Sequence, residues 1–268
     1  MLGQIINGDV FRTIKVKQLH PTSGAEVIDA DFTILSEEQF DEIKQAMAKY
    51  KVLVFRKANL SDKEHVEFSR KLGELHDFKL HVKEPRFGYF KIFDVGNIDE
   101  NGKPHALDSP RTLFGRGNAL RNKGSPEYFS DLDPGSQPMV RHQIVSTHAP
   151  SGRNTFCVGN YLHHIENADG TPLLEEENAA LIEKLIRHVT RPKNVLRLEW
   201  HDNGDIIAWD NVSTLHRTTG GSCGGKFTRD MRRTTVKDDS AEAWGLNPTK
   251  VVLATDSLDL KTMSFHKK

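Results

Sequence analysis

The sequence has little cysteine, no excess of charge of either sign and no long hydrophobic run. Its 268 residues include two cysteines, Cys157 and Cys223, which form no zinc motif and are too few for a disulfide scaffold. Lys plus Arg and Asp plus Glu both number 37, so no basic excess favours a nucleic-acid partner. No stretch of 18 apolar residues is present, which argues against a membrane span.

The N-terminal residues MLGQIINGDV lack the basic start and apolar run of a secretory signal, so we expect a cytoplasmic protein. Hydrophobic residues make up 37% of the chain and charged residues 28%, a globular composition. We expect one domain over residues 1–268, with an irregular segment near 97–137 that is rich in Gly, Pro, Asn, Asp and Ser. A run this long without periodicity is typical of a functional loop or a disordered segment.

Elsewhere the pattern alternates between helical and strand-like periodicity. Helical spacing predicts three helices, at 35–50, 60–75 and 173–190. Short apolar or alternating runs predict strands at 12–19, 51–56, 89–97, 142–148, 153–162, 194–200, 206–211 and 229–239. Residues 20–27 read as a turn. Mixed elements followed by a strand-rich C-terminal part favour a mixed α/β (α+β) fold, a barrel or jelly roll with packed helices.

One histidine follows a predicted buried strand and is a candidate metal ligand. Residues 206–209 form the apolar strand, Asp210 and Asn211 end it, and His216 comes six residues after Asp210. Neutral imidazole is a suitable ligand for Fe(II). A surface histidine or a hydrogen-bonded core histidine would fit the same position.

The predicted strand at 229–239 carries arginines. Arg229 and Arg233 are four residues apart and would share one face of a strand, while Arg232 would face the other way. Two guanidinium groups on an inward face need anionic partners, and their planar fork suits carboxylates. The alternative is a solvated basic edge that discourages aggregation.

The order of these motifs resembles the TauD/TfdA-like family of Fe(II)/2-oxoglutarate dioxygenases. The C-terminal likeness is a Trp-Asp-Asn turn, a histidine, a Gly-rich loop and two arginines four apart. Further likeness lies in HPTSGAEV (20–27), KYKVLVFR (49–56), HVEFSRKLGEL (65–75), GRGNAL (115–120) and DDSAEAWGLN (238–247). The resemblance spans about Ile14 to Asn247.

The resemblance implies a double-stranded β-helix, or jelly roll, with flanking helices, and an iron held by a His-X-Asp pair and a distal histidine. His216 matches the distal iron ligand. Arg229 matches the arginine that pairs with the co-substrate 2-oxoglutarate, and Arg233 the arginine that faces an anionic substrate group. Asn118 lies in the stretch that leads into the active site and is a candidate substrate contact.

The sequence departs from the family in one respect: no His-X-Asp occurs anywhere in it. In the family a segment like GNAL is followed almost at once by that pair, whereas here Leu120 is followed by sequence that resembles a region well downstream. We therefore expect several tens of residues to be absent between Leu120 and Arg121. The jelly roll would be incomplete, and one remaining histidine cannot organise a three-ligand iron site.

Three functional hypotheses follow. The chain is a dioxygenase that uses Fe(II) and 2-oxoglutarate to oxidise a small, anionic organic molecule; it is an inactive relative that acts as a binding or partner protein; or it is a shortened gene or splice product. We expect a small-molecule ligand, no nucleic-acid partner and no membrane partner. Exposed strand edges around the join at 120–121 leave homo-oligomer formation open.

Overall fold

The chain forms two compact units, each built from separate stretches of sequence. The computed structural model describes residues 5–6, 11–78, 85–98, 102–104, 140–159, 162, 164–217, 226–241, 243 and 245–246. Unit 1 comprises Met1–Ser61 and Ile144–Arg217, and unit 2 comprises Asp62–Gln143 and Thr218–Lys268. The single domain expected over 1–268 stays a prediction. None of the helices in the described ranges has the length and apolar character needed to cross a bilayer.

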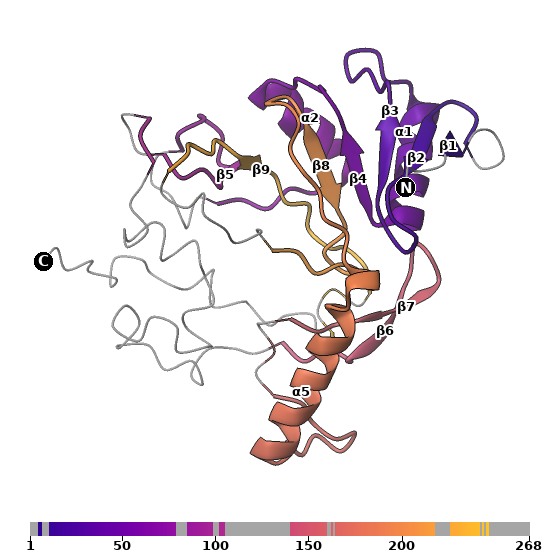
Figure 1. The fold of residues 1–268 in the computed structure, drawn as a ribbon, viewed down its shortest axis with the longest axis vertical. Coiled ribbons are helices and arrows are strands. Elements are labelled where there is room, and N and C mark those ends of the chain that lie inside the picture. Colours follow the sequence, from indigo (N-terminus) through magenta and orange to yellow (C-terminus); the bar gives the residue numbers. More distant parts are fainter. Residues whose placement is uncertain are drawn as a thin grey trace, which may run out of the picture. The chain divides into compact units, whose positions relative to one another are not determined.

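Unit 1 contains a mixed sheet of five strands in the order β1-β2-β3-β4-β8 (Figure 1). The strands are β1 (Ile5–Ile6), β2 (Lys15–Gln18), β3 (Ala25–Ile28), β4 (Val52–Phe55) and β8 (Ile206–Trp209). β4 pairs parallel with β3 and antiparallel with β8. Its position between two strands explains its uninterrupted apolar sequence, VLVF, in which Leu53, Val54 and Phe55 are buried.

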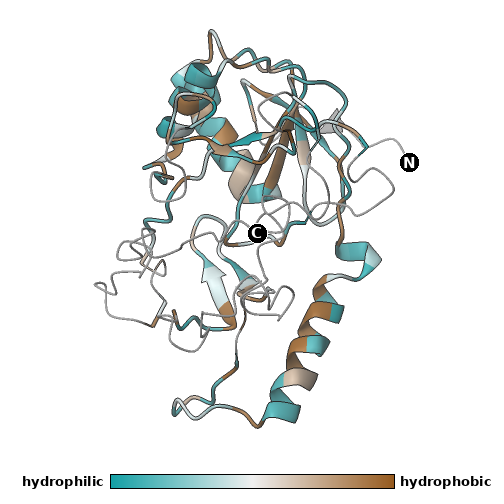
Figure 2. Ribbon diagram, turned by 90° about the vertical axis from the view of Figure 1, so that its left-hand side faces the viewer, coloured by the Kyte–Doolittle hydropathy of each residue, from teal (hydrophilic) through white to brown (hydrophobic). Residues whose placement is uncertain are grey.

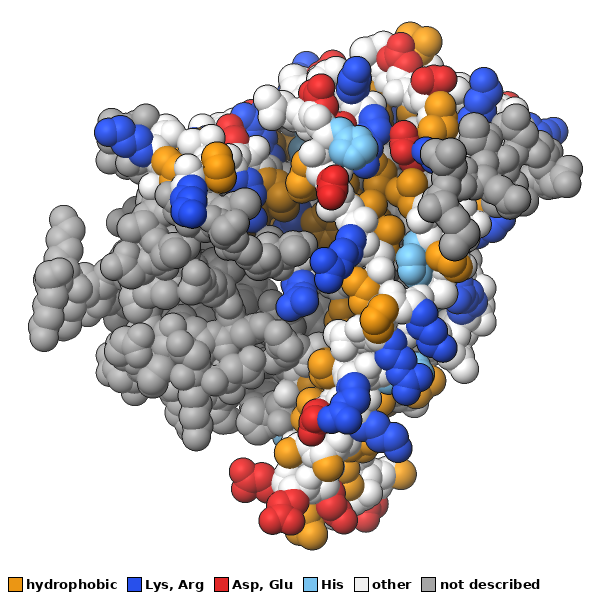
Figure 3. Space-filling view, viewed as in Figure 1, with side chains coloured by type: hydrophobic (Ala, Val, Ile, Leu, Met, Phe, Trp, Pro, Cys, Tyr) orange, Lys and Arg blue, Asp and Glu red, His pale blue; other side chains and the backbone are white. Residues whose placement is uncertain are grey.

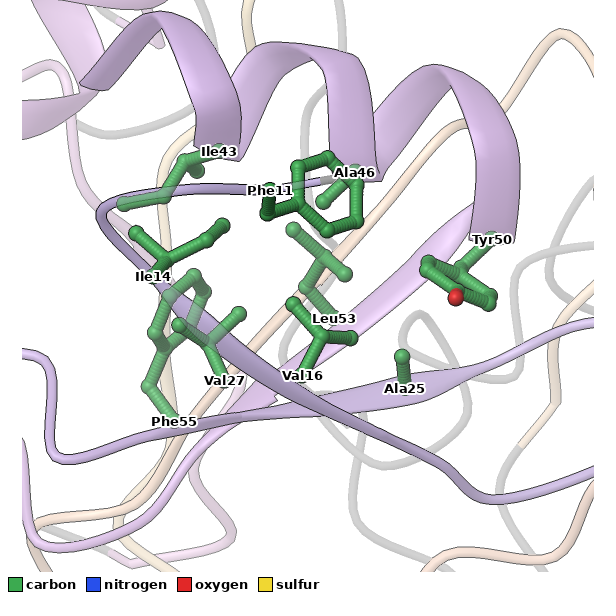
Figure 4. Packing of buried hydrophobic residues seen from close by; sticks show 10 residues of the cluster. All are labelled: Phe11, Ile14, Val16, Ala25, Val27, Ile43, Ala46, Tyr50, Leu53 and Phe55. Atoms are coloured by element: carbon green, nitrogen blue, oxygen red, sulfur yellow. The ribbon is translucent and has the colours of Figure 1, made fainter. Parts of the chain in front are cut away.

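Helix α1 (Glu37–Tyr50) covers one face of this sheet (Figure 4). Its start is set by a capping box, because Ser36 accepts from the Gln39 backbone and the Gln39 side chain accepts from Ser36. Its apolar side packs on the strands. The cluster consists of Phe11, Ile14, Val16, Ala25, Val27, Ile43, Ala46, Tyr50, Leu53 and Phe55.

A buried carboxylate ties the segment before β2 to α1. The Glu42 side chain accepts from the backbone N–H groups of Arg12, Thr13 and Ile14 at 2.7, 2.8 and 3.0 Å, and from the Thr13 hydroxyl at 2.8 Å. Burial alone would raise the pKa of Glu42, but these hydrogen bonds to the charged form outweigh it and lower the pKa to about 2. The ionised carboxylate therefore holds the chain in place.

The rest of unit 1 is a hairpin and a largely uncovered helix. Strands β6 (Val145–His148) and β7 (Arg153–Phe156) pair antiparallel around Ser151 and Gly152. Helix α5 (Glu175–Val189) has acidic residues in its first turn and basic residues in its last, and none of its residues is buried. Its ribbon is coloured by hydrophobic and hydrophilic residues in turn (Figure 2), and Figure 3 shows apolar side chains at its surface. A short 3-10 helix, η2 (Pro192–Asn194), follows.

The described residues of unit 2 contain one helix and one pair of short strands. Helix α2 (Asp62–Leu72) buries Val66 and Ser69, and the Ser69 hydroxyl lies 2.7 Å from that of Thr234. Strands β5 (Phe93–Asp94) and β9 (Arg232–Arg233) pair antiparallel. Val66, Leu75 and Ile92 form a small buried core, against which Phe87, Tyr89 and Val236 pack.

The three predicted helices are confirmed, as are strands within 12–19, 51–56, 89–97, 142–148, 153–162, 206–211 and 229–239. The strand predicted at 194–200 is wrong: residues 195–200 carry no regular structure. The turn predicted at 20–27 is too long. Gly24, at φ 79°, ends the turn, and Ala25 is already the first residue of β3, where it pairs with β2 and β4.

We expect Glu42→Gln to lower the free energy of unfolding by about 1–3 kcal/mol, because a charged acceptor of several buried N–H groups is replaced by a neutral amide with one acceptor oxygen. The folded pKa of about 2 lies below the ordinary 4.5, so the stabilisation is present above pH 4.5 and is lost as the pH falls towards 2. Urea unfolding at pH 7 and pH 3 measures this. Glu38→Gln, on the exposed Arg12–Glu38 pair, is the control. If wild type and Glu42→Gln differed in free energy of unfolding by the same amount at pH 7 and at pH 3, the predicted pH dependence would be contradicted.

Candidate functional site

The strand that leads to the candidate metal ligand is held at its start by a buried aspartate. Asp205 accepts from the Arg56 guanidinium at 2.6 Å and from the backbone N–H groups of His201 and Lys57 at 2.8 and 3.1 Å. Burial alone would raise the pKa of Asp205, but the hydrogen bonds outweigh it and lower the pKa to about 2. The charged carboxylate thereby joins the end of β4 to the start of β8.

The end of β8 is a turn built on Asp210. Its carboxylate accepts from the Val212 backbone at 2.9 Å and from the Ser213 hydroxyl at 2.7 Å, and its carbonyl accepts from the Thr214 backbone at 3.0 Å. Such side-chain bonds to the backbone just ahead are typical of Asp in turns. His216 follows two residues after Thr214. The predicted placement of this histidine after a strand and a turn is confirmed.

His216 is exposed, and its imidazole lies against the indole of Trp209, with ring centroids 4.8 Å apart. A family iron site needs a second histidine and a carboxylate beside this one. The described residues contain no group of three or more His, Cys, Asp or Glu side chains that could hold a metal ion. Within the described ranges, therefore, the side chains do not fit a complete iron centre.

The segment with the candidate carboxylate-binding arginines lies in unit 2. Arg229 is exposed and precedes β9. The prediction that Arg229 and Arg233 lie on one strand is therefore wrong. Asn97 holds its backbone: the Asn97 side chain accepts from Arg229 N at 2.6 Å and donates to Phe227 O at 2.9 Å. The Arg229 guanidinium donates to the carbonyl of Val95 at 3.0 Å.

Within β9 the two arginines have different surroundings. Arg232 is exposed and pairs with Asp62 at 3.0 Å and with Asp230 at 3.4 Å. Arg233 is half-buried, and its guanidinium lies 5.1 Å from the ring centroid of Phe93 on the paired strand β5. The prediction that Arg232 and Arg233 face opposite ways is consistent with this difference in burial.

Arg86 links the acidic side chains beside these arginines. It contacts Asp94 at 2.9 Å and Asp230 at 2.5 Å. Burial would lower the pKa of Arg86, but the two carboxylates outweigh it and raise that pKa. The aspartates on this face of unit 2 are therefore already engaged by arginines.

The convergence of His216 with Arg229 and Arg233 stays a prediction, because the histidine lies in unit 1 and the arginines in unit 2. Asn118 lies outside the described residues, as does the segment 115–138 around the expected join. These four residues remain the candidate site by resemblance.

Unit 1 contains a buried polar cluster that the sequence pattern did not predict. Lys51, His148, Ser151 and Asp210 contact one another, although they come from three separate stretches of chain. The only sequence signal was a lysine and a histidine within otherwise apolar or turn-like runs. Neither is distinctive without knowledge of which strands pair.

The comparisons with known proteins identify the family. The sequence model for "Taurine catabolism dioxygenase TauD, TfdA family" matches residues 15–110 and 104–235, and the chain belongs to this family. It is thus a member of a dioxygenase family, as its motifs indicated.

Individual relatives agree. The alpha-ketoglutarate-dependent 2,4-dichlorophenoxyacetate dioxygenase of Cupriavidus pinatubonensis (strain JMP 134 / LMG 1197) is 26% identical over 293 residues, covering 85% of this chain and 99% of the relative. The enzyme with the same description from Burkholderia sp. (strain RASC) is 25% identical, covering 84% and 94%. The crystal structure of AAD-2 in complex with Mn(II) and N-oxalylglycine has a TM-score of 0.66 at 23% identity, covering 84% and 98%.

The alignment with the Cupriavidus relative is longer than this whole chain, at 293 against 268 residues. The relative therefore contains segments that have no counterpart here. This agrees with the expected loss of sequence, and its location between Leu120 and Arg121 stays a prediction.

We expect Asn97→Ala to loosen the backbone around Arg229, since it removes both side-chain hydrogen bonds to residues 227 and 229. Each is worth about 1 kcal/mol, so hydrogen exchange of the Arg229 amide rises about tenfold or more. Mass-spectrometric or NMR exchange measures it. Glu74→Gln, on the exposed pair with Lys237 in the same unit, is the control. Unchanged exchange at Arg229 would show that Asn97 does not hold this segment.

Proposed function

We propose that this chain is an Fe(II)/2-oxoglutarate-class oxidoreductase by descent whose remaining function is to bind small organic acids. The family match over residues 15–235 carries this proposal. Its fold would be a jelly roll with flanking helices, incomplete where the expected segment is absent.

Arg229 is the proposed contact to the far carboxylate of 2-oxoglutarate. Its backbone is fastened by Asn97, and its guanidinium has one hydrogen bond to Val95 O in the described part of the chain. A guanidinium carries five N–H donors, so a carboxylate can still be bound by the same fork. Its exposure leaves that fork open to a ligand.

The proposed substrate is an anionic organic acid that Arg233 and Asn118 contact. Support comes from two relatives described as 2,4-dichlorophenoxyacetate dioxygenases, whose substrate carries a carboxylate. Arg233 is half-buried beside Phe93, and a guanidinium against an aromatic ring suits an acid that also has an apolar part.

The metal site is the part of the expected family pattern that this sequence does not complete. His216 is the one family iron-ligand position that its sequence retains, since His-X-Asp is absent. We therefore propose weak Fe(II) binding and little or no turnover. A catalytically inactive partner protein, which binds another protein in place of a small organic acid, is the second candidate function, and the absence of His-X-Asp favours it.

We expect the purified chain to form no succinate from 2-oxoglutarate above a protein-free control, with Fe(II), ascorbate and 2,4-dichlorophenoxyacetate present. Two of the three ligands needed to organise the metal are missing. 2-Oxoglutarate itself should bind weakly, and Arg229→Ala should reduce its affinity about tenfold or more, because a charged hydrogen bond is worth about 1.5–3 kcal/mol. Isothermal titration calorimetry measures the affinity, with Arg187→Ala on exposed α5 as the matched control.

Iron-dependent succinate formation that His216→Ala abolishes would show that another side chain replaces the missing pair. Equal 2-oxoglutarate affinity in wild type and Arg229→Ala would contradict the carboxylate role. Sequencing of the transcript around codons 120–121 separates a shortened gene product from a stable family variant, since an additional coding stretch with His-X-Asp would identify the former.

A further inference from the structure

The buried polar cluster of unit 1 joins three parts of the chain at the end of β8. The Lys51 ammonium lies 2.7 Å from Nδ1 of His148 and 2.7 Å from the Ser151 hydroxyl. Nε2 of His148 lies 2.8 Å from Oδ2 of Asp210. Lys51 and His148 are buried, with 6% and 5% of their surface exposed. Charged groups are placed this deeply only when they are paired.

The chemistry of the donors determines the protonation of the histidine. An ammonium group has donors and no acceptor, so Nδ1 of His148 must accept when Lys51 donates to it. The proton of the neutral ring is then on Nε2, from which it is donated to Asp210. Lys51 thereby orients the imidazole, and the imidazole in turn orients the carboxylate.

The position of Lys51 is itself determined by the backbone. It is the C-cap of α1, with φ at 68°, and its N–H donates to Met47 O at 2.8 Å. Its carbonyl accepts from Asp210 N at 2.9 Å. Lys51 thus bonds to Asp210 directly through its backbone carbonyl and indirectly through the His148 side chain. Val212, Ser213 and Thr214 of the turn also bond to Asp210.

We propose that Lys51 and His148 are positioning residues that hold the 210–214 turn and thereby place His216 against Trp209. This deepens the proposed function, because it names what orients the retained ligand position. Asp210 transmits the effect, since the same carboxylate accepts from His148 and from the turn. His216 lies beyond the cluster and makes its ring contact with Trp209 at the end of β8.

The test reads the position of His216 directly. In wild type we expect nuclear Overhauser effects between the Trp209 indole and His216 imidazole protons, since the rings are 4.8 Å apart. Lys51→Met and His148→Leu should lose them, and hydrogen exchange of the Val212 and Thr214 amides should rise about tenfold. Lys49→Met, which removes a lysine two residues away and outside the cluster, should leave both unchanged.

Two isosteric variants separate positioning from folding. The amide nitrogen of His148→Gln reaches where Nε2 lies and can still donate to Asp210, whereas that of His148→Asn is too short. We expect the Trp209–His216 effects to persist in His148→Gln and to vanish in His148→Asn, with both proteins folded. This pair gives the answer even where Lys51→Met or His148→Leu fails to fold.

Retention of the Trp209–His216 effects in folded Lys51→Met or His148→Asn, with only a lower unfolding temperature, would overturn the proposal and leave the cluster a purely stabilising one. None of these readouts needs a metal. Broadening of the His216 signals by added Mn(II) tests the ligand role separately, so failure of that role is distinguishable from failure of the positioning role.

Discussion

The pairing of β4 with β8 is the constraint on which unit 1 depends. It brings Val52–Phe55 against Ile206–Trp209, residues more than 150 positions apart in the chain. Closing so large a loop is entropically costly, and the apolar core beneath β4 must offset that cost. The two ends of the pair are then fastened by carboxylates, Asp205 at one end and Asp210 at the other.

Ionised carboxylates have the same role throughout this unit. Glu42, Asp205 and Asp210 each accept at least one backbone N–H from a segment without regular structure. A carboxylate has two acceptor oxygens and makes stronger, charge-assisted hydrogen bonds, so it compensates more donors than a neutral amide with one acceptor oxygen. Irregular stretches are thereby attached to the sheet without extending it. Because these hydrogen bonds favour the ionised form, the pKa values of Glu42 and Asp205 are lowered to about 2.

The functional segments of the family are unequally retained. The strand and turn leading to His216 and the strand carrying Arg233 are built and hydrogen-bonded. The sequence between them and the N-terminal sheet lacks the metal pair. The arginines that we propose to recognise acids are thus present, whereas the His-X-Asp that would complete the proposed metal site is absent. That imbalance is the physical ground for proposing binding ahead of turnover.

Local pattern in the sequence determined the three helices, the strand at 206–209 and the order of motifs by which the family was recognised. These features depend on caps, periodicity and residue type, all of which are local. The failures have a common cause. Whether a short segment becomes a strand depends on which partner edge is available, which is why β3 was not predicted and the strand predicted at 194–200 does not form. Arg229 lies outside β9 because that strand pairs with only two residues of β5. The Lys51–His148–Asp210 cluster was decided by tertiary structure alone. Its members are unremarkable in sequence and become a charge-compensated unit only when β4 and β8 lie side by side, where burial makes each unpaired alternative costly.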